Sequence, residues 1–199
     1  MNEPYRLSFT FGGLLHLETV IIAQRYRELP DWEDLKSEAI HGELLRKTRA
    51  SSRYRYFREI RDRFSAAWPF EMELIAAESS ESRLVSFAIC CRYYRILGDF
   101  VREVVRDKIA MHEKSLGLSD YYHFLEAKKL LHPELMTISE TTRAKLRQVT
   151  FRMLAEGTLL EKGRGHLIRI PSVPESLASR YRELGDFESL ENLLYRNNR

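Results

Sequence analysis

The sequence predicts a mainly α-helical protein, a helical bundle that carries a winged helix-turn-helix near its C-terminal end. Helical patterns of apolar residues alternate with proline and glycine breaks along most of the chain. Between Thr137 and Ile170, a helical stretch is followed by two short apolar segments around the turn Lys-Gly-Arg-Gly. Helix, strand, turn and strand in this order are typical of a recognition helix with a β-hairpin wing.

The composition is that of a globular protein, with 199 residues of which 44% are hydrophobic and 31% charged. A chain of this length can form one domain or two small ones. We expect an N-terminal helical region over residues 1–80 and a second region over 81–199, which could also pack as a single domain. The net charge of +3 is modest, so the distribution of charge decides whether a polyanion is a plausible partner.

The N-terminal region begins with an expected extended segment over residues 5–13. A helix follows from Leu14 to Leu29, with Leu14, Leu17 and Ile21 on one side and Val20 at its border, and Pro30 ends it. Asp31 is expected to cap the next helix.

Residues 46–63 are strongly basic, with eight positive and two negative side chains. We expect a helix here that is capped by Ser51 or Ser52. With residues 33–45 as its first helix, the stretch could form a second helix-turn-helix whose cations bind phosphate. The alternative is a helix paired with acidic neighbours such as Glu71, Glu73, Glu78 and Glu81. The phosphate-binding candidates are Arg46, Lys47, Arg49, Arg53, Arg55 and Arg58.

A long central helix is expected from about Ser82 to Ser115, because its first half is apolar on most sides, and Gly117 should close it. Ser119 should cap a helix over 120–131, which His132-Pro133 ends. After Pro174, two further helices are expected on either side of Gly185.

The predicted recognition helix covers residues 140–156, with Ser139 as its cap and Gly157 as a left-handed terminal residue. Its buried face carries Leu146, Val149 and Met153. The opposite face carries a row of polar and cationic side chains long enough to follow a major groove, namely Thr141, Lys145, Gln148 and Arg152.

Other cations of this unit are placed for contacts with the DNA backbone. Arg143 and Arg147 flank the row on the helix. Lys162, Arg164 and His166 are expected at the wing. The alternatives are a wing that docks on protein and a charged face that is merely solvated.

One internal similarity stands out, because RYRELPDWEDL (25–35) and RYRELGDFESL (180–190) agree at eight of eleven positions. In each copy the sequence predicts the end of a helix, a helix-breaking Pro or Gly, an Asp that caps the next helix and an aromatic residue that anchors it. A reused helix–helix corner and a duplicated half-domain both explain the match.

Known catalytic and metal-binding signatures are absent from the sequence. The six histidines show no HExxH or paired Cys/His spacing, and no phosphate loop or GxSxG turn occurs. We therefore expect no catalytic residue, no metal and no cofactor. Cys90 and Cys91 are adjacent in an apolar run, which indicates buried thiols in a reducing cytoplasm. The longest uncharged run has 11 residues, too few for a membrane span, and no secretory signal is recognised.

The segment YRLSFTFGGLL (5–15), with the following helix, the Pro-Asp-Trp corner and the Arg-rich stretch, resembles the BrxA family. This family comprises the small A-type subunits of bacteriophage exclusion (BREX) defence systems. Its members have been described as inner-membrane proteins, as similar to the NusB antitermination fold and as DNA-binding proteins. The hydropathy conflicts with the first description. The resemblance carries no catalytic motif, and it implies a role in phage defence.

Taken together, these features predict a non-enzymatic protein that binds double-stranded DNA mainly through phosphates, with other BREX proteins as further partners. The alternatives are an assembly subunit that docks on larger defence proteins, and RNA binding of the NusB type.

Overall fold

The computed structural model describes residues 3–9, 12–42, 44–161 and 165–195, and most of these residues are helical. The mainly α-helical class predicted from the sequence is therefore confirmed. The chain divides into two compact units, Leu15–Ile89 and Met1–Leu14 together with Cys90–Arg199. The predicted regions 1–80 and 81–199 are a different division, and they remain a prediction.

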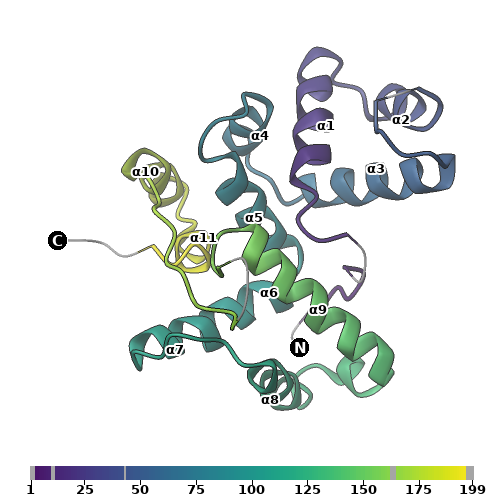
Figure 1. Ribbon diagram of the computed structural model, residues 1–199. Helices are drawn as coiled ribbons and strands as arrows, with labels where there is room; N and C mark the ends of the chain where they lie inside the picture. Colours follow the sequence, from purple (N-terminus) through teal and green to yellow (C-terminus); the bar gives the residue numbers. More distant parts are fainter. Residues whose placement is uncertain (1–2, 10–11, 43, 162–164, 196–199) are drawn as a thin grey trace. The chain divides into compact units, whose positions relative to one another are not determined.

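The described residues of the unit Leu15–Ile89 form four helices and the first part of a fifth. These are α1 (His16–Glu28), α2 (Trp32–His41), α3 (Ala50–Phe64), α4 (Pro69–Ala76) and α5 (Ser82–Tyr93). Within this unit α1 packs on α4, and α2 packs on α3 (Figure 1). Asp31 caps α2 as predicted, because its carboxylate accepts hydrogen bonds from the backbone nitrogens of Glu33 at 2.8 Å and Asp34 at 3.0 Å.

Two local predictions in this unit are wrong. Leu17 is 73% exposed, whereas Val20, Ile22 and Ala23 form the buried face of α1. Leu14 and Leu15 precede the helix, and Leu15 has a left-handed backbone with φ of 56°, so Leu14 does not set the helical phase. Neither serine caps α3, which begins at Ala50 after Arg49 and has no side-chain cap.

The other unit contains the end of α5 and the remaining helices. These are α6 (Arg95–Phe100), the π-helix η1 (Val101–Val105), α7 (Arg106–Ala110), α8 (Leu118–Lys128), the 3-10 helix η2 (Pro133–Met136), α9 (Glu140–Glu156), α10 (Glu175–Glu183) and α11 (Phe187–Asn192). Aromatic side chains join several of them. The ring of Phe100 lies 5.2 Å from those of Tyr121 and Phe124 and 6.3 Å from that of Phe151.

The long helix predicted over 82–115 is interrupted. Tyr94 leaves the helical conformation between α5 and α6, and its fully buried ring packs 4.9 Å from that of Phe9. The helical path ends at Ala110, and Gly117 lies at the N-terminal cap of α8. There the backbone nitrogen of Gly117 donates to the Asp120 carboxylate at 2.6 Å, so Ser119 is not the cap. The apolar pattern continues through Tyr94 with no proline or glycine to mark the interruption, so the prediction missed it.

The predicted β-hairpin does not appear as a pair of strands among the described residues. An isolated antiparallel bridge joins Leu160 to Ile168, and a second joins Ser115 to Leu167. Around the first bridge, the nitrogen of Glu161 donates to the Leu167 oxygen and that of Arg169 to the Leu159 oxygen, both at 2.9 Å. Three short extended segments thus lie side by side, with 166–169 between 114–116 and 159–161.

Each helix in the described part of the chain is too short or too polar to cross a bilayer.

Candidate nucleic-acid interface

Helix α9 separates its buried and exposed faces as the sequence predicts. Leu146, Val149 and Met153 are at most 1% exposed. The predicted polar row lies on the opposite face and is exposed throughout, at Thr141, Lys145, Gln148 and Arg152. The helix therefore presents hydrogen-bonding and cationic groups along most of its length.

The ends of α9 are fixed by local chemistry. The Ser139 hydroxyl accepts a hydrogen bond from the Thr142 nitrogen at 3.2 Å, which confirms the predicted cap. Gly157 has φ of −78°, so the prediction of a left-handed Gly157 is wrong. The left-handed residue is Thr158, with φ of 68°. The nitrogens of Leu159 and Leu160 then donate back to the Leu154 oxygen, which directs the chain away from the helix.

Hydrogen bonds hold members of the row in place. The Lys145 ammonium donates to the Gln148 Oε1 atom at 3.1 Å, one turn along the helix. The Arg152 Nη1 atom donates to the backbone oxygen of Gly12 at 3.0 Å. The first bond links neighbours on the row, and the second joins the row to the N-terminal segment.

Arg143 and Arg147 are less accessible than the row that they flank. Arg143 has only 17% side-chain exposure and forms ion pairs with Glu126 at 3.3 Å and Glu140 at 3.2 Å. Hydrogen bonds from Lys129, with the charges of Lys129 and Arg143, lower the pKa of the Glu126 carboxyl. The Arg147 guanidinium donates to the Tyr122 hydroxyl at 2.6 Å. Both arginines therefore join α9 to α8, and phosphate would compete with these contacts.

The predicted wing is described only in part. Lys162 and Arg164 lie outside the described residues. His166 is half-buried, and its ring lies 4.8 Å from that of Phe151 on α9. His166 therefore packs on the helix.

The Arg-rich segment of the unit Leu15–Ile89 divides into structural and exposed cations. Arg53 donates to the backbone oxygens of Ile40 at 2.7 Å and Lys47 at 2.9 Å, which ties α3 to the end of α2 and to the loop between them. Lys47 is ion-paired with Glu18 at 2.8 Å, and this hydrogen-bonded contact raises the pKa of its ammonium. The exposed cationic side chains of this segment are Arg46, Arg49, Arg55 and Arg58.

The connection between α2 and α3 spans residues 42–49. A helix-turn-helix joins its helices through three or four residues. This length argues against the second helix-turn-helix but leaves the exposed arginines as a basic surface.

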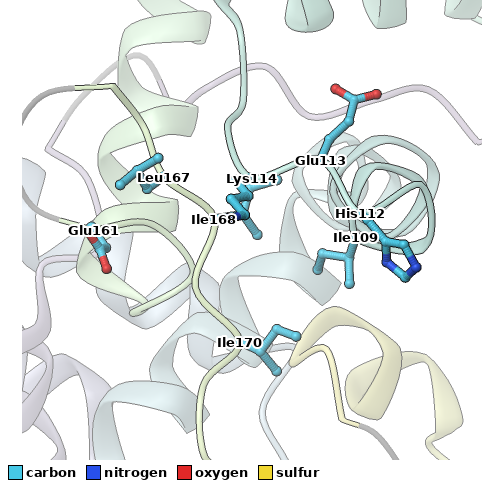
Figure 2. A pocket seen from close by; sticks show the side chains of 8 residues that line it. All are labelled: Ile109, His112, Glu113, Lys114, Glu161, Leu167, Ile168 and Ile170. Carbon is cyan, nitrogen blue, oxygen red and sulfur yellow. The ribbon is translucent and has the colours of Figure 1, made fainter.

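A pocket of about 470 Å³ lies beside the extended segments of the unit that contains α9. Figure 2 shows its lining residues, which are Ile109, His112, Glu113, Lys114, Glu161, Leu167, Ile168 and Ile170. Its Glu113 is ion-paired with Lys108 at 2.5 Å. Among the described residues, no group of three His, Cys, Asp or Glu side chains is placed to hold a metal ion. Cys90 and Cys91 are buried thiols, as predicted, and burial raises the pKa of the Cys91 thiol.

The sequence reasoning missed one part of the site, the contact between the N-terminal segment and the end of α9. The backbone nitrogen of Leu14 donates to the Glu156 carboxylate at 2.6 Å, two residues from the carbonyl that Arg152 binds. Two consecutive glycines at the end of a predicted extended segment were the available signal. Such a pair favours a turn, but it does not reveal which helix the turn packs against.

Comparison with known proteins identifies relatives over most of the chain. The family model described as BrxA matches residues 3–184. A protein of Escherichia coli O9:H4 (strain HS) named "BREX protein BrxA" is 25% identical over 169 residues, which cover 84% of this chain and 79% of that protein. The crystal structure of an uncharacterized protein from Magnetospirillum magneticum is similar with a TM-score of 0.82 at 22% identity, covering 96% of this chain and 98% of that one. This last likeness concerns the fold alone.

Proposed function

The chain belongs to the BrxA family, and on this premise we propose that it is a non-enzymatic, DNA-binding component of a bacteriophage exclusion (BREX) defence system. It binds duplex DNA mainly through phosphates. The role in defence rests on the family, and the DNA-binding role rests on the geometry of α9.

The order of elements around α9 supports a winged helix-turn-helix. The helical stretch 95–110 is followed by Ser115, α8, α9 and the bridged residues Leu160 and Ile168. In winged helices, a short strand between the first two helices pairs with the last strand of the wing, and Ser115 pairs with Leu167 here. The connection from α8 to α9 is longer than a standard turn, because η2 lies within it. The proposal therefore depends on the helix face more than on the turn.

The exposed row on α9 is the observation that carries the proposal. From Thr141 to Arg152 the row extends about 16 Å at a rise of 1.5 Å per residue, long enough to lie along a major groove. Gln148 and Thr141 can hydrogen-bond to base edges or phosphates, and Lys145 and Arg152 supply charge. Such a row binds polyanions with a strong dependence on salt.

Charge reversal tests this assignment. The double variant K145E/R152E removes two cations and adds two repelling charges, so we expect affinity for duplex DNA to fall at least about ten-fold at 0.1 M salt. The control R27E/K36E makes the same change in net charge on the helices α1 and α2 and should bind nearly as the wild type does. Fluorescence anisotropy with a labelled duplex measures both. Equal affinity of K145E/R152E and the wild type would contradict the assignment of the DNA-binding site to α9.

A second candidate function, docking on a larger defence protein, is favoured by a separate observation. The connection between α8 and α9 exposes three apolar side chains, Leu130 at 86%, Leu131 at 60% and Met136 at 60%. Exposed apolar groups this close in sequence are typical of protein contacts. Co-purification with a partner after nuclease treatment, without measurable DNA affinity, would favour this function over the first.

RNA binding of the NusB type is separated from DNA binding by competition. A hairpin RNA and a duplex DNA of equal length compete for the protein at one salt concentration. We expect the DNA to displace the RNA, because the deep, narrow major groove of A-form RNA does not admit a helix.

A further inference from the structure

The N-terminal segment is joined to the last turn of α9 by two hydrogen bonds. Arg152 donates to the Gly12 oxygen at 3.0 Å, and Glu156 accepts from the Leu14 nitrogen at 2.6 Å. Arg152 and Glu156 are four residues apart, so their side chains leave the helix on the same face. The segment 12–14 thus crosses the helix at the end of the exposed row.

Gly13 is required at this crossing for two independent reasons. Its φ of 110° lies in the region that side chains rarely adopt. A Cβ atom placed on it would also lie 2.7 Å from the Glu156 Oε2 atom and 2.8 Å from the Arg152 Cδ atom. Any larger residue would displace one of these two side chains, so the close approach of backbone to helix depends on glycine.

The hydrogen bond to Gly12 orients the Arg152 side chain and leaves its other donors available for a ligand. A guanidinium has five N–H donors, and the Gly12 oxygen takes one of them. The side chain remains exposed, so the other donors can reach a ligand outside the protein. A long side chain whose rotamer is already fixed loses less entropy when it binds.

We propose that the turn Gly12–Gly13, together with Glu156, is a positioning element for DNA binding that fixes Arg152 at the end of the recognition row. This inference rests on the proposed function and extends it to residues that do not themselves contact DNA. Glu156 positions the turn through the Leu14 nitrogen, and the turn positions Arg152 through the Gly12 oxygen.

Glu156 provides a test in which positioning and simple electrostatics predict opposite signs. Removal of a negative charge from a DNA-binding helix should tighten binding if only charge matters. In E156A the acceptor for the Leu14 nitrogen is lost as well, so positioning predicts weaker binding, by about three- to ten-fold. In E156Q an oxygen acceptor remains while the charge is gone, so this variant should bind at least as tightly as the wild type.

The experiment measures duplex DNA affinity over a salt series for the wild type, R152A, G13A, E156A and E156Q. Loss of one phosphate contact makes the negative slope of log K against log salt less steep by about 1. We expect this loss in R152A, G13A and E156A, and no further loss in the double variant G13A/R152A. The control G185A alters another glycine of positive φ, 69°, that has no neighbouring atom within 4 Å of an added Cβ. It should keep the wild-type slope.

The outcomes separate this inference from the proposed function. If R152A binds as the wild type does, the DNA site itself is wrong and the positioning role fails with it. If R152A loses affinity but G13A and E156A do not, the site stands and the positioning role is overturned. If G13A does not fold, E156A and E156Q alone test the positioning role. DNA affinity below that of the wild type for E156A, with affinity at or above the wild type for E156Q, supports it. Any other order overturns it.

Discussion

Tyr121 lies in the aromatic cluster of the unit that contains α9, with its ring 5.2 Å from that of Phe100 and its side chain 1% exposed. Burial raises the pKa of its phenol to about 12. The folded protein therefore holds this proton more tightly than the unfolded chain, whose tyrosine pKa is about 10. The stabilisation is fully present below pH 10 and is lost as the pH rises towards 12.

We expect the free energy of unfolding to fall by about 1 kcal/mol more in the wild type than in Y121F between pH 9 and pH 11. The Phe variant lacks the titrating group but keeps most of the ring packing. Urea unfolding at the two pH values gives the difference, and Tyr5, whose phenol pKa is also raised by burial and by Asp99, is unchanged in both proteins. Parallel pH dependences would contradict the assignment.

The repeated corners 25–35 and 180–190 allow the same substitution to be compared on two elements. Asp31 caps α2 from an exposed position. Asp186 caps α11 through the Ser189 nitrogen at 3.0 Å and also pairs with Arg92 at 3.1 Å, where its side chain is 8% exposed. The capping role is shared, and the ion pair belongs to the second corner.

Replacement by alanine should therefore cost different amounts of stability. D31A removes an exposed cap and should cost about 1 kcal/mol. D186A removes a cap and one partner of a mostly buried ion pair, so we expect a loss of roughly 3 kcal/mol or more. Urea denaturation followed by circular dichroism measures both. Equal losses would mean that the Arg92 contact adds nothing to stability.

The sequence predicted those elements whose signals are local. The bounds of α9 and the caps at Asp31 and Ser139 follow from residues within one turn of the helix end, and the structure confirms them. The exposed row on α9 followed from helical periodicity alone. By contrast, Tyr94, at which the long helix is interrupted, packs against Phe9, a residue far away in the sequence.

The same distinction applies to the cations of the candidate site. Lys145 is exposed as expected, whereas Arg143 and Arg53 make contacts with other segments that no local pattern reveals. The Gly12–Gly13 crossing of α9 was missed for the same reason, because its partner lies about 140 residues along the chain. Periodicity identifies the side of a helix that faces outward, but it does not identify tertiary partners.

For the whole molecule, the net charge of +3 is unevenly distributed. The unit Leu15–Ile89 has twelve basic and thirteen acidic residues, and the unit with α9 has twenty basic and sixteen acidic residues. The excess of positive charge thus accompanies the proposed recognition helix. In the unit Leu15–Ile89 the basic stretch 46–63 is compensated elsewhere, so its contribution depends on which of its arginines are exposed.

The first turn of α3 offers a test of whether this basic surface contributes to DNA binding. It contains no acidic residue, and Arg49 occupies the cap position, although positive charge is unfavourable at a helix N-terminus. A bound phosphate would reverse that penalty.

The variant R49A/R58A should therefore make the negative slope of log K against log salt less steep by roughly 2, if each arginine binds one phosphate. R53A is the contrasting variant, because it breaks the bonds to Ile40 and Lys47 and should lower the melting temperature instead. An unchanged slope in R49A/R58A, with normal stability, would restrict DNA binding to the unit that carries α9.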